Sequence, residues 1–158
     1  MKKQGFTLIE LMVVIVIMGI LAAVAVPKLF GMIAKSKASE IPTAAGAYIN
    51  MQDAFALEKG ALGNWVEIGY SAPGSKTNAS SFASTNFNYT SGDDDFGWQA
   101  SNINKLNDCA ASSTWNLGPS YVATGNNEGS VSYTATSSSA DCMGLTPAFS
   151  SLAKSLGS

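Results

Sequence analysis

Residues 2–27 of this chain read KKQGFTLIELMVVIVIMGILAAVAVP. The sixteen residues from Leu11 to Val26 carry no charge, and Glu10 is the only charged residue between Phe6 and Val26. As a helix, the segment from Phe6 to Val26 would be about 31 Å long, because each residue adds about 1.5 Å. The hydrocarbon core of a bilayer is about 30 Å thick. The segment is therefore predicted to be a helix that spans a membrane or lies in a dry helix bundle.

The helical pattern continues beyond Pro27 and ends before Gly60, which is well suited to a C-terminal cap. Apolar residues recur there every three or four positions, namely at Phe30, Ile33, Ala34, Ile41, Ala44, Tyr48, Met51 and Phe55. Phe6 to Lys59 would thus form one rod of 54 residues. The remaining 99 residues cannot bury such a rod, so its apolar half must be housed elsewhere. Pro27 and Pro42 each remove a helical hydrogen bond and are predicted to kink it.

Composition separates this apolar end from a polar remainder. Of the 99 residues from Gly60 to Ser158, 37 are Ser, Thr or Asn. The 158-residue chain has a net charge of −2, contains no His, and has only Lys among its nine basic residues. Because His is the commonest general base and metal ligand, we assign no catalytic residue, no metal ligand and no cofactor. The acidic balance and the lack of Arg leave no specific nucleic-acid site visible.

The polar part is predicted to form short strands. Val66, Ile68 and Tyr70 share one face of a first strand, and Val131, Tyr133 and Ala135 share one face of another. Residues 125–129, GNNEG, indicate a hairpin turn before the second of these. Further strands are expected at Thr85–Thr90, Phe96–Ala100 and Thr114–Leu117. The fold class is therefore α+β, with an antiparallel sheet of about four strands laid over the second half of the helix. The buried helix face would consist of Ile41, Ala44, Tyr48, Met51 and Phe55.

Two further groups of residues are more typical of structure than of a site. Asp93, Asp94 and Asp95 offer the hard oxygen ligands that suit Ca²⁺, but their spacing is not that of a calcium loop, and we expect a solvated turn. Three tryptophans could stack on a sugar, although aromatic residues in a small head more often belong to the core. They are Trp65, Trp98 and Trp115.

The N-terminal segment carries a family resemblance. Residues 2–10, KKQGFTLIE, look like the processing site of type IV prepilins and pseudopilins, and residues 19–27, GILAAVAVP, resemble the helix of that family. The resemblance covers about the first 40 residues. It implies a ladle-shaped fold, cleavage between Gly5 and Phe6 by a prepilin peptidase on the cytoplasmic side, and N-methylation of Phe6. The chain would divide into a leader at 1–5, a transmembrane and filament-core helix at 6–27, an amphipathic helix at 28–59 and a β-rich head at 60–158.

Glu10 gains a physical role from this resemblance. After cleavage Phe6 would carry a cationic amine, four residues before Glu10 on the same helix face. In a filament the carboxylate could instead meet the Phe6 amine of a neighbouring copy. Desolvation offsets much of that attraction, so the pair would set register more than stability. The alternative is a glutamate that reaches to the lipid head groups.

Cys109 and Cys142 are the only cysteines. In an exported head they are expected to form a disulfide, which would contribute roughly 3–4 kcal/mol by closing the loop between them. A free catalytic thiol is the competing interpretation, but the chain has no His to activate it.

The leading functional hypothesis is a structural subunit of a type IV pilus, held first in the inner membrane by one span and then polymerised into an extracellular helical homopolymer. The resemblance implies roles in adhesion, surface motility or DNA uptake, with pilus assembly machinery as a partner. One alternative is a pseudopilin of a type II secretion system. Another is a secreted soluble binding protein whose signal peptide is cleaved after Ala25, the end of a small-x-small site.

Overall fold

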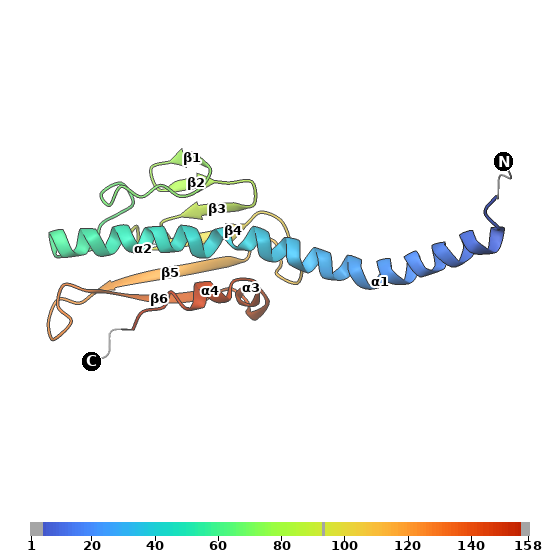
Figure 1. Ribbon diagram of the computed structural model, residues 1–158. Coiled ribbons are helices and arrows are strands. Elements are labelled where there is room, and N and C mark those ends of the chain that lie inside the picture. The colour runs from blue at the N-terminus through green and yellow to red at the C-terminus, as the bar shows by residue number, and fades with distance from the viewer. Residues whose placement is uncertain (1–4, 93, 156–158) are drawn as a thin grey trace.

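The computed structural model describes residues 5–92 and 94–155. Helices α1 (Leu8–Ala38) and α2 (Glu40–Lys59) follow each other and together form the long helix in Figure 1. Only Ser39 separates them, three residues before Pro42. Pro42 has no N–H to offer the preceding turn, which gives a physical reason for an interruption there. The predicted rod is confirmed except for its first two residues and this single break.

The end of the long helix also agrees with the sequence. Gly60 takes the left-handed conformation, with φ +68°, and its N–H donates to the carbonyl of Ala56 at 2.8 Å. Glycine adopts this conformation without the steric cost of a Cβ, so it ends the helix cleanly.

Within the described residues, six strands form one antiparallel sheet in which the spatial order is the sequence order. The prediction of about four strands was therefore too low. The strands are β1 (Ser75–Asn78), β2 (Ser81–Ala83), β3 (Phe87–Thr90), β4 (Trp98–Asn102), β5 (Thr114–Tyr121) and β6 (Val131–Ser137). Two short helices follow, α3 (Ala140–Leu145) and α4 (Pro147–Ser150). The predicted hairpin at 125–129 joins β5 to β6 as expected.

The first predicted strand, through Val66, Ile68 and Tyr70, is wrong, because residues 65–69 form turns. The Asn64 side chain accepts from the N–H groups of Val66 and Glu67, both at 3.0 Å. Asparagine competes in this way with regular structure by bonding to nearby backbone groups. The alternating apolar residues of this segment therefore belong to turns rather than to a strand.

The core lies between α2 and the inner face of the sheet, and aromatic rings dominate it. Trp65, Trp98 and Trp115 are fully buried, as expected of core residues. Trp98 donates its Nε1–H to the Tyr70 hydroxyl at 2.9 Å, and Tyr70 donates to the carbonyl of Ala44 in α2 at 3.0 Å. These bonds satisfy the polar ends of the rings and fix the helix against the sheet.

The predicted buried face of α2 is correct at Ile41, Ala44 and Tyr48 and wrong at Met51, which is 40% exposed. Phe55 is half-buried. The fully buried position is the neighbouring Gln52. Its side-chain amide is placed to donate to the carbonyl of Gly63 at 3.0 Å and to accept from the N–H of Gly63 at 3.2 Å. A polar residue occupies the core there because the chain that turns back from α2 needs a hydrogen-bond partner.

The free edge of β6 receives the last described residues. Tyr133 and Lys154 exchange two backbone hydrogen bonds of 3.0 Å each. The Tyr133 hydroxyl donates to Asp53 Oδ1 of α2 at 2.7 Å. Burial, followed by the interaction with Asp53, raises the pKa of Tyr133, so the hydroxyl remains a donor. Tyr133 of β6 thereby links the sheet edge both to helix α2 and to the segment around Lys154.

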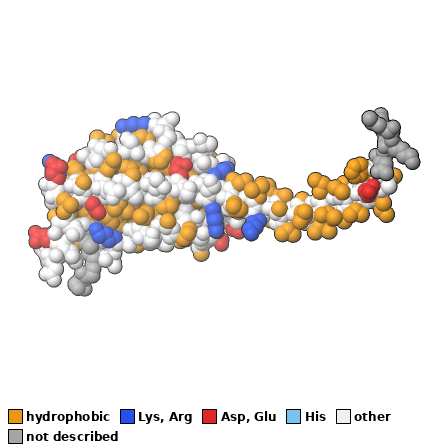
Figure 2. Space-filling view, viewed as in Figure 1, with side chains coloured by type: hydrophobic (Ala, Val, Ile, Leu, Met, Phe, Trp, Pro, Cys, Tyr) orange, Lys and Arg blue, Asp and Glu red, His pale blue; other side chains and the backbone are white. Residues whose placement is uncertain are grey.

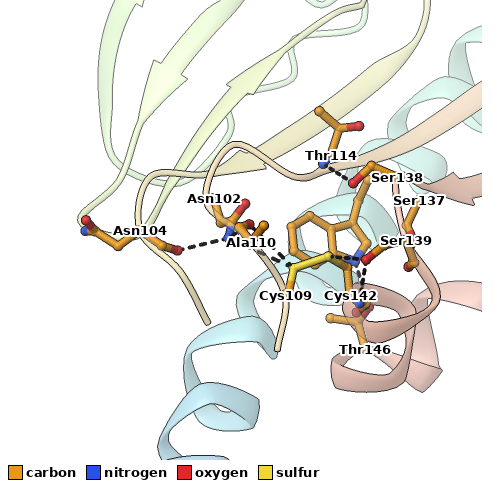
Figure 3. Close-up of a disulfide and its surroundings, with 11 residues drawn as sticks. Asn102, Asn104, Cys109, Ala110, Thr114, Ser137, Ser138, Ser139, Cys142 and Thr146 are labelled. Atoms are coloured by element: carbon orange, nitrogen blue, oxygen red, sulfur yellow. Dashed lines mark hydrogen bonds between the residues drawn. A yellow bond between two sulfur atoms is a disulfide. The ribbon is translucent and has the colours of Figure 1, made fainter. Parts of the chain in front are cut away.

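The predicted disulfide is present between Cys109 and Cys142, whose Cα atoms are 4.7 Å apart. It ties the connection between β4 and β5 to α3 (Figure 3). Asn102 supports the same connection, since its Nδ2 donates to the carbonyls of Asn104 at 2.9 Å and Ala110 at 2.8 Å. Both cysteines are fully buried.

The acidic cluster is described only in part, because Asp93 lies outside the described residues. Asp94 Oδ1 accepts from the N–H of Gly97 at 3.1 Å, and Asp95 Oδ1 accepts from the Ser91 hydroxyl at 3.3 Å. The two described carboxylates thus bond to their own loop. Among the described residues, no group of three or more His, Cys, Asp or Glu is arranged to hold a metal ion.

Candidate assembly site

The N-terminal part of α1 extends far beyond the head and is apolar on every side. Figure 2 shows hydrophobic side chains along the whole projecting helix. The exposed fraction ranges from 47% at Val14 to 86% at Phe6 among the large apolar residues up to Val26. This helix is long and apolar enough to cross a membrane, and it is the single described helix of which this is true. An apolar surface of this extent needs lipid or other protein to cover it.

Glu10 lies in the first turn of this helix and bonds to its own chain. Its Oε2 accepts from the Thr7 N–H at 2.8 Å and from the Thr7 hydroxyl at 2.7 Å. The Thr7 Oγ1 in turn accepts from the Glu10 N–H at 3.4 Å. Together these contacts form a capping box, which satisfies N–H groups that the first helical turn leaves free. In the described part of the chain, Glu10 Oε1 accepts no hydrogen bond.

The helix starts later than the sequence suggested, which corrects the expected geometry of Phe6. Thr7 is the N-cap, with an extended backbone, and the first helical residue is Leu8. Phe6 therefore precedes the helix instead of sharing a helical face with Glu10. The cause is the capping box, because the Thr7 side chain can accept from the Glu10 N–H only when Thr7 itself is outside the helix.

The other predicted residues of the segment are also placed. Gly5 and Phe6 are exposed, and cleavage between them stays a prediction. Pro27 lies inside α1, which continues through it. The kink predicted at Pro27 stays a prediction. Gly19 and Gly31 have open space where a Cβ would point, so a neighbouring helix could approach closely at both positions.

Comparisons with known proteins find a family motif in this same segment and relatives that match part of the chain. A family model described as the prokaryotic N-terminal methylation motif matches residues 1–26. The chain is 44% identical over 70 residues to the type IV major pilin protein PilA of Myxococcus xanthus, and 50% identical over 44 residues to the type IV major fimbrial protein FimA of Dichelobacter nodosus. It is 45% identical over 58 residues to the fimbrial protein EcpC of Eikenella corrodens.

The chain is therefore similar to type IV pilins and fimbrial proteins over part of its length.

The similarity is confined to part of each pilin. The matched segments span 44% of this chain and 32% of the Myxococcus protein, and 28% of both this chain and the Dichelobacter protein. For the Eikenella protein they span 37% of this chain and 38% of the relative. The chain thus covers about a third of the length of the curated relatives it matches. No solved structure matches it.

Thr7 is the residue of this site whose role was not predicted from the sequence. The signal was present, since Thr followed three residues later by Glu, just before an apolar run, is the pattern of a capping box. Its role here is to hold the Glu10 carboxylate by two hydrogen bonds. That role makes Thr7 a positioning residue for any partner that Glu10 binds.

We expect Thr7→Val to lower the amount of assembled filament several-fold and Thr7→Ser to leave it unchanged. Valine removes the hydroxyl that bonds Glu10, while serine keeps it, and loss of an N-cap hydroxyl costs about 1 kcal/mol. The measurement is an immunoblot of sheared surface filament against membrane-bound subunit. Equal filament yields from the two variants would show that the hydroxyl does not matter.

Proposed function

We propose that this chain is a structural subunit of a type IV pilus that polymerises through α1 into a cell-surface filament. The observation that carries the proposal is an apolar helix whose surface is exposed on all sides outside the head, with a single carboxylate near its start. Such a helix fits two environments in succession, first a bilayer and then a bundle of identical helices. Adhesion, surface motility and DNA uptake are the roles expected of such a fibre.

The proposal includes a defined order of events. The chain would first cross the inner membrane once, with its head outside and residues 1–5 on the cytoplasmic side. A prepilin peptidase would cleave between Gly5 and Phe6, and Phe6 would be N-methylated. The pilus assembly machinery would then draw α1 out of the bilayer and into the extracellular fibre.

Glu10 is proposed to select the position of each incoming subunit. Cleavage would create an amine at Phe6, and the carboxylate of a neighbouring copy would be its partner. Two features support this pairing. The Phe6 residue stands outside its own helix, and Glu10 keeps one oxygen free of hydrogen bonds within the described chain. A charge inside an apolar bundle is tolerated only when it is paired.

We expect the mature chain to start at Phe6 with a methylated amine. The exposed Gly5–Phe6 bond directly before the capping box is where a peptidase would separate the leader from the intact helix. Intact-mass and N-terminal peptide mass spectrometry of the purified protein decide the matter. A mature terminus at Val26 would instead support the secreted soluble protein and would overturn the pilus proposal.

A further inference from the structure

Four lysines gather where the long helix enters the head, and we call this region the lysine end. Lys28, Lys35 and Lys37 belong to the final part of α1, and Lys105 lies in the connection that the disulfide ties to α3. Helix α3 packs beside α1, which places this connection near the same end (Figure 1). All four lysines are exposed, and none forms an ion pair with a residue that the structure describes. Three acids lie in the same region, namely Glu40 at the start of α2, Asp108 in the connection and Asp141 in α3, so the four lysines still leave a positive net charge.

The opposite end of the head carries acids, and we call it the acid end. Glu58 is in the last turn of α2, Glu67 is in the turn that follows, and Glu128 is in the turn between β5 and β6. These segments are neighbours, because a Cβ built on Gly60 would lie 3.5 Å from the Tyr121 hydroxyl at the end of β5.

Only part of the charge at the acid end is neutralised locally. Lys59 pairs with Glu58 at 2.8 Å. Neither Glu67 nor Glu128 has a lysine partner among the described residues. In Figure 2 acidic side chains lie at the far end of the head, while basic ones gather where the projecting helix begins.

Membrane topology does not explain the lysine end. Lysines are favoured in cytoplasmic segments that flank a span, whereas Lys28, Lys35 and Lys37 would lie on the exported side. Removal of the leader would also take away Lys2 and Lys3, which leaves these exported lysines as the basic residues nearest the span. Their placement calls for a partner outside the membrane.

We propose that the lysine end of one copy docks against the acid end of the next copy along the filament. This inference rests on the proposed function. All copies would insert through the membrane in the same direction, so their heads share one orientation and successive heads meet head to tail. A contact between unlike surfaces propagates as a helical filament when its rotation does not close into a ring. Contacts between two lysine ends or two acid ends are disfavoured by like charges.

The test reverses charges at each end separately and then together. The lysine-end variant is Lys35→Glu with Lys37→Glu, the acid-end variant is Glu67→Lys with Glu128→Lys, and the combined variant carries all four changes. Lys76→Glu is the matched control, because Lys76 is exposed, has no ion pair within the described residues and lies on the edge strand β1, at neither end. For every strain, sheared filament and membrane-bound processed subunit are quantified by immunoblot and electron microscopy.

We expect the yield of sheared filament from each single-end variant to be at least about fivefold lower than from wild type. The reason is that repulsion between like charges replaces exposed ion pairs at every contact between successive copies. Processed subunit in the membrane should be unchanged. The combined variant should regain at least half of the wild-type yield, and Lys76→Glu should equal wild type. Normal filament from both single-end variants would overturn the inference, as would a loss that the combined variant does not rescue.

The same experiment separates this inference from the function on which it rests. If wild-type cells carry no filament built of this chain, the pilus proposal itself fails. If the lysine end binds anionic lipid head groups instead, the lysine-end variant alone should be defective, and the acid-end changes should neither harm nor rescue assembly. That result would also overturn head-to-tail docking.

Discussion

Glu10→Val is expected to abolish most filament while leaving processed subunit in the membrane. The variant removes the only charge between Phe6 and Val26, so insertion into the bilayer should be unharmed or improved. Assembly would then bury the Phe6 amine without its partner. Breaking a buried ion pair by removing one member costs about 3–5 kcal/mol. Because the same cost recurs with each added subunit, the loss of fibre should be large.

Glu10→Gln is the control that separates the charge from the helix cap. Glutamine can accept the hydrogen bonds of a capping box as glutamate does, but it cannot neutralise an amine. We expect it to assemble as poorly as Glu10→Val. The measurement compares sheared filament with membrane-bound subunit by immunoblot. Wild-type filament from Glu10→Gln would show that the carboxylate acts only as a cap, and wild-type filament from Glu10→Val would refute any assembly role.

Replacing both cysteines by serine is expected to lower the stability of the head by roughly 3–4 kcal/mol, the value that the chain-entropy model gives for a loop of about this length. The fold itself should persist, since Asn102 still holds the connection after β4 and Trp115 still donates to Thr146 beside α3 at 2.8 Å. Thermal unfolding of the full chain in detergent, followed by near-ultraviolet circular dichroism of the buried tryptophans, measures the effect. We expect the midpoint to fall by at least about 10 °C.

The single variants Cys109→Ser and Cys142→Ser provide the control for this measurement. Each removes the same bond, so both should unfold close to the double variant. A double variant that unfolds at the wild-type temperature would show that the disulfide adds no stability to the head.

The sequence predicted the long helix and the β5–β6 hairpin because each depends on local signals. An uncharged run fixes the first half of the helix, Gly60 fixes its end, and the GNNEG turn fixes the hairpin. The candidate assembly site was proposed from one short motif that contains Gly5, Phe6 and Glu10, and their roles there stay a prediction. The late start of the helix does not follow from the apolar run, because Thr7 caps the helix instead of joining it.

Other features could not be predicted, because they depend on contacts between residues that are far apart in the sequence. Strands β1 and β2 were not predicted, because β1 has four exposed residues and no apolar alternation. Met51 was assigned to the core on its hydrophobicity, whereas the buried position went to Gln52, whose amide faces the backbone of Gly63. The opposite charges of the two ends of the head became apparent only when the fold brought Glu67 close to the end of α2 and Lys105 to the side of α3.

The order of the strands has a consequence for the speed at which the head folds. Every ladder of the described sheet joins strands that are adjacent in sequence, so each pairing closes only a short loop and loses little chain entropy. The sheet can therefore grow from one strand to the next along the chain. The contacts of Cys142, Thr146 and Lys154 with earlier parts of the chain can form only late during synthesis, because those residues follow all six strands in the sequence.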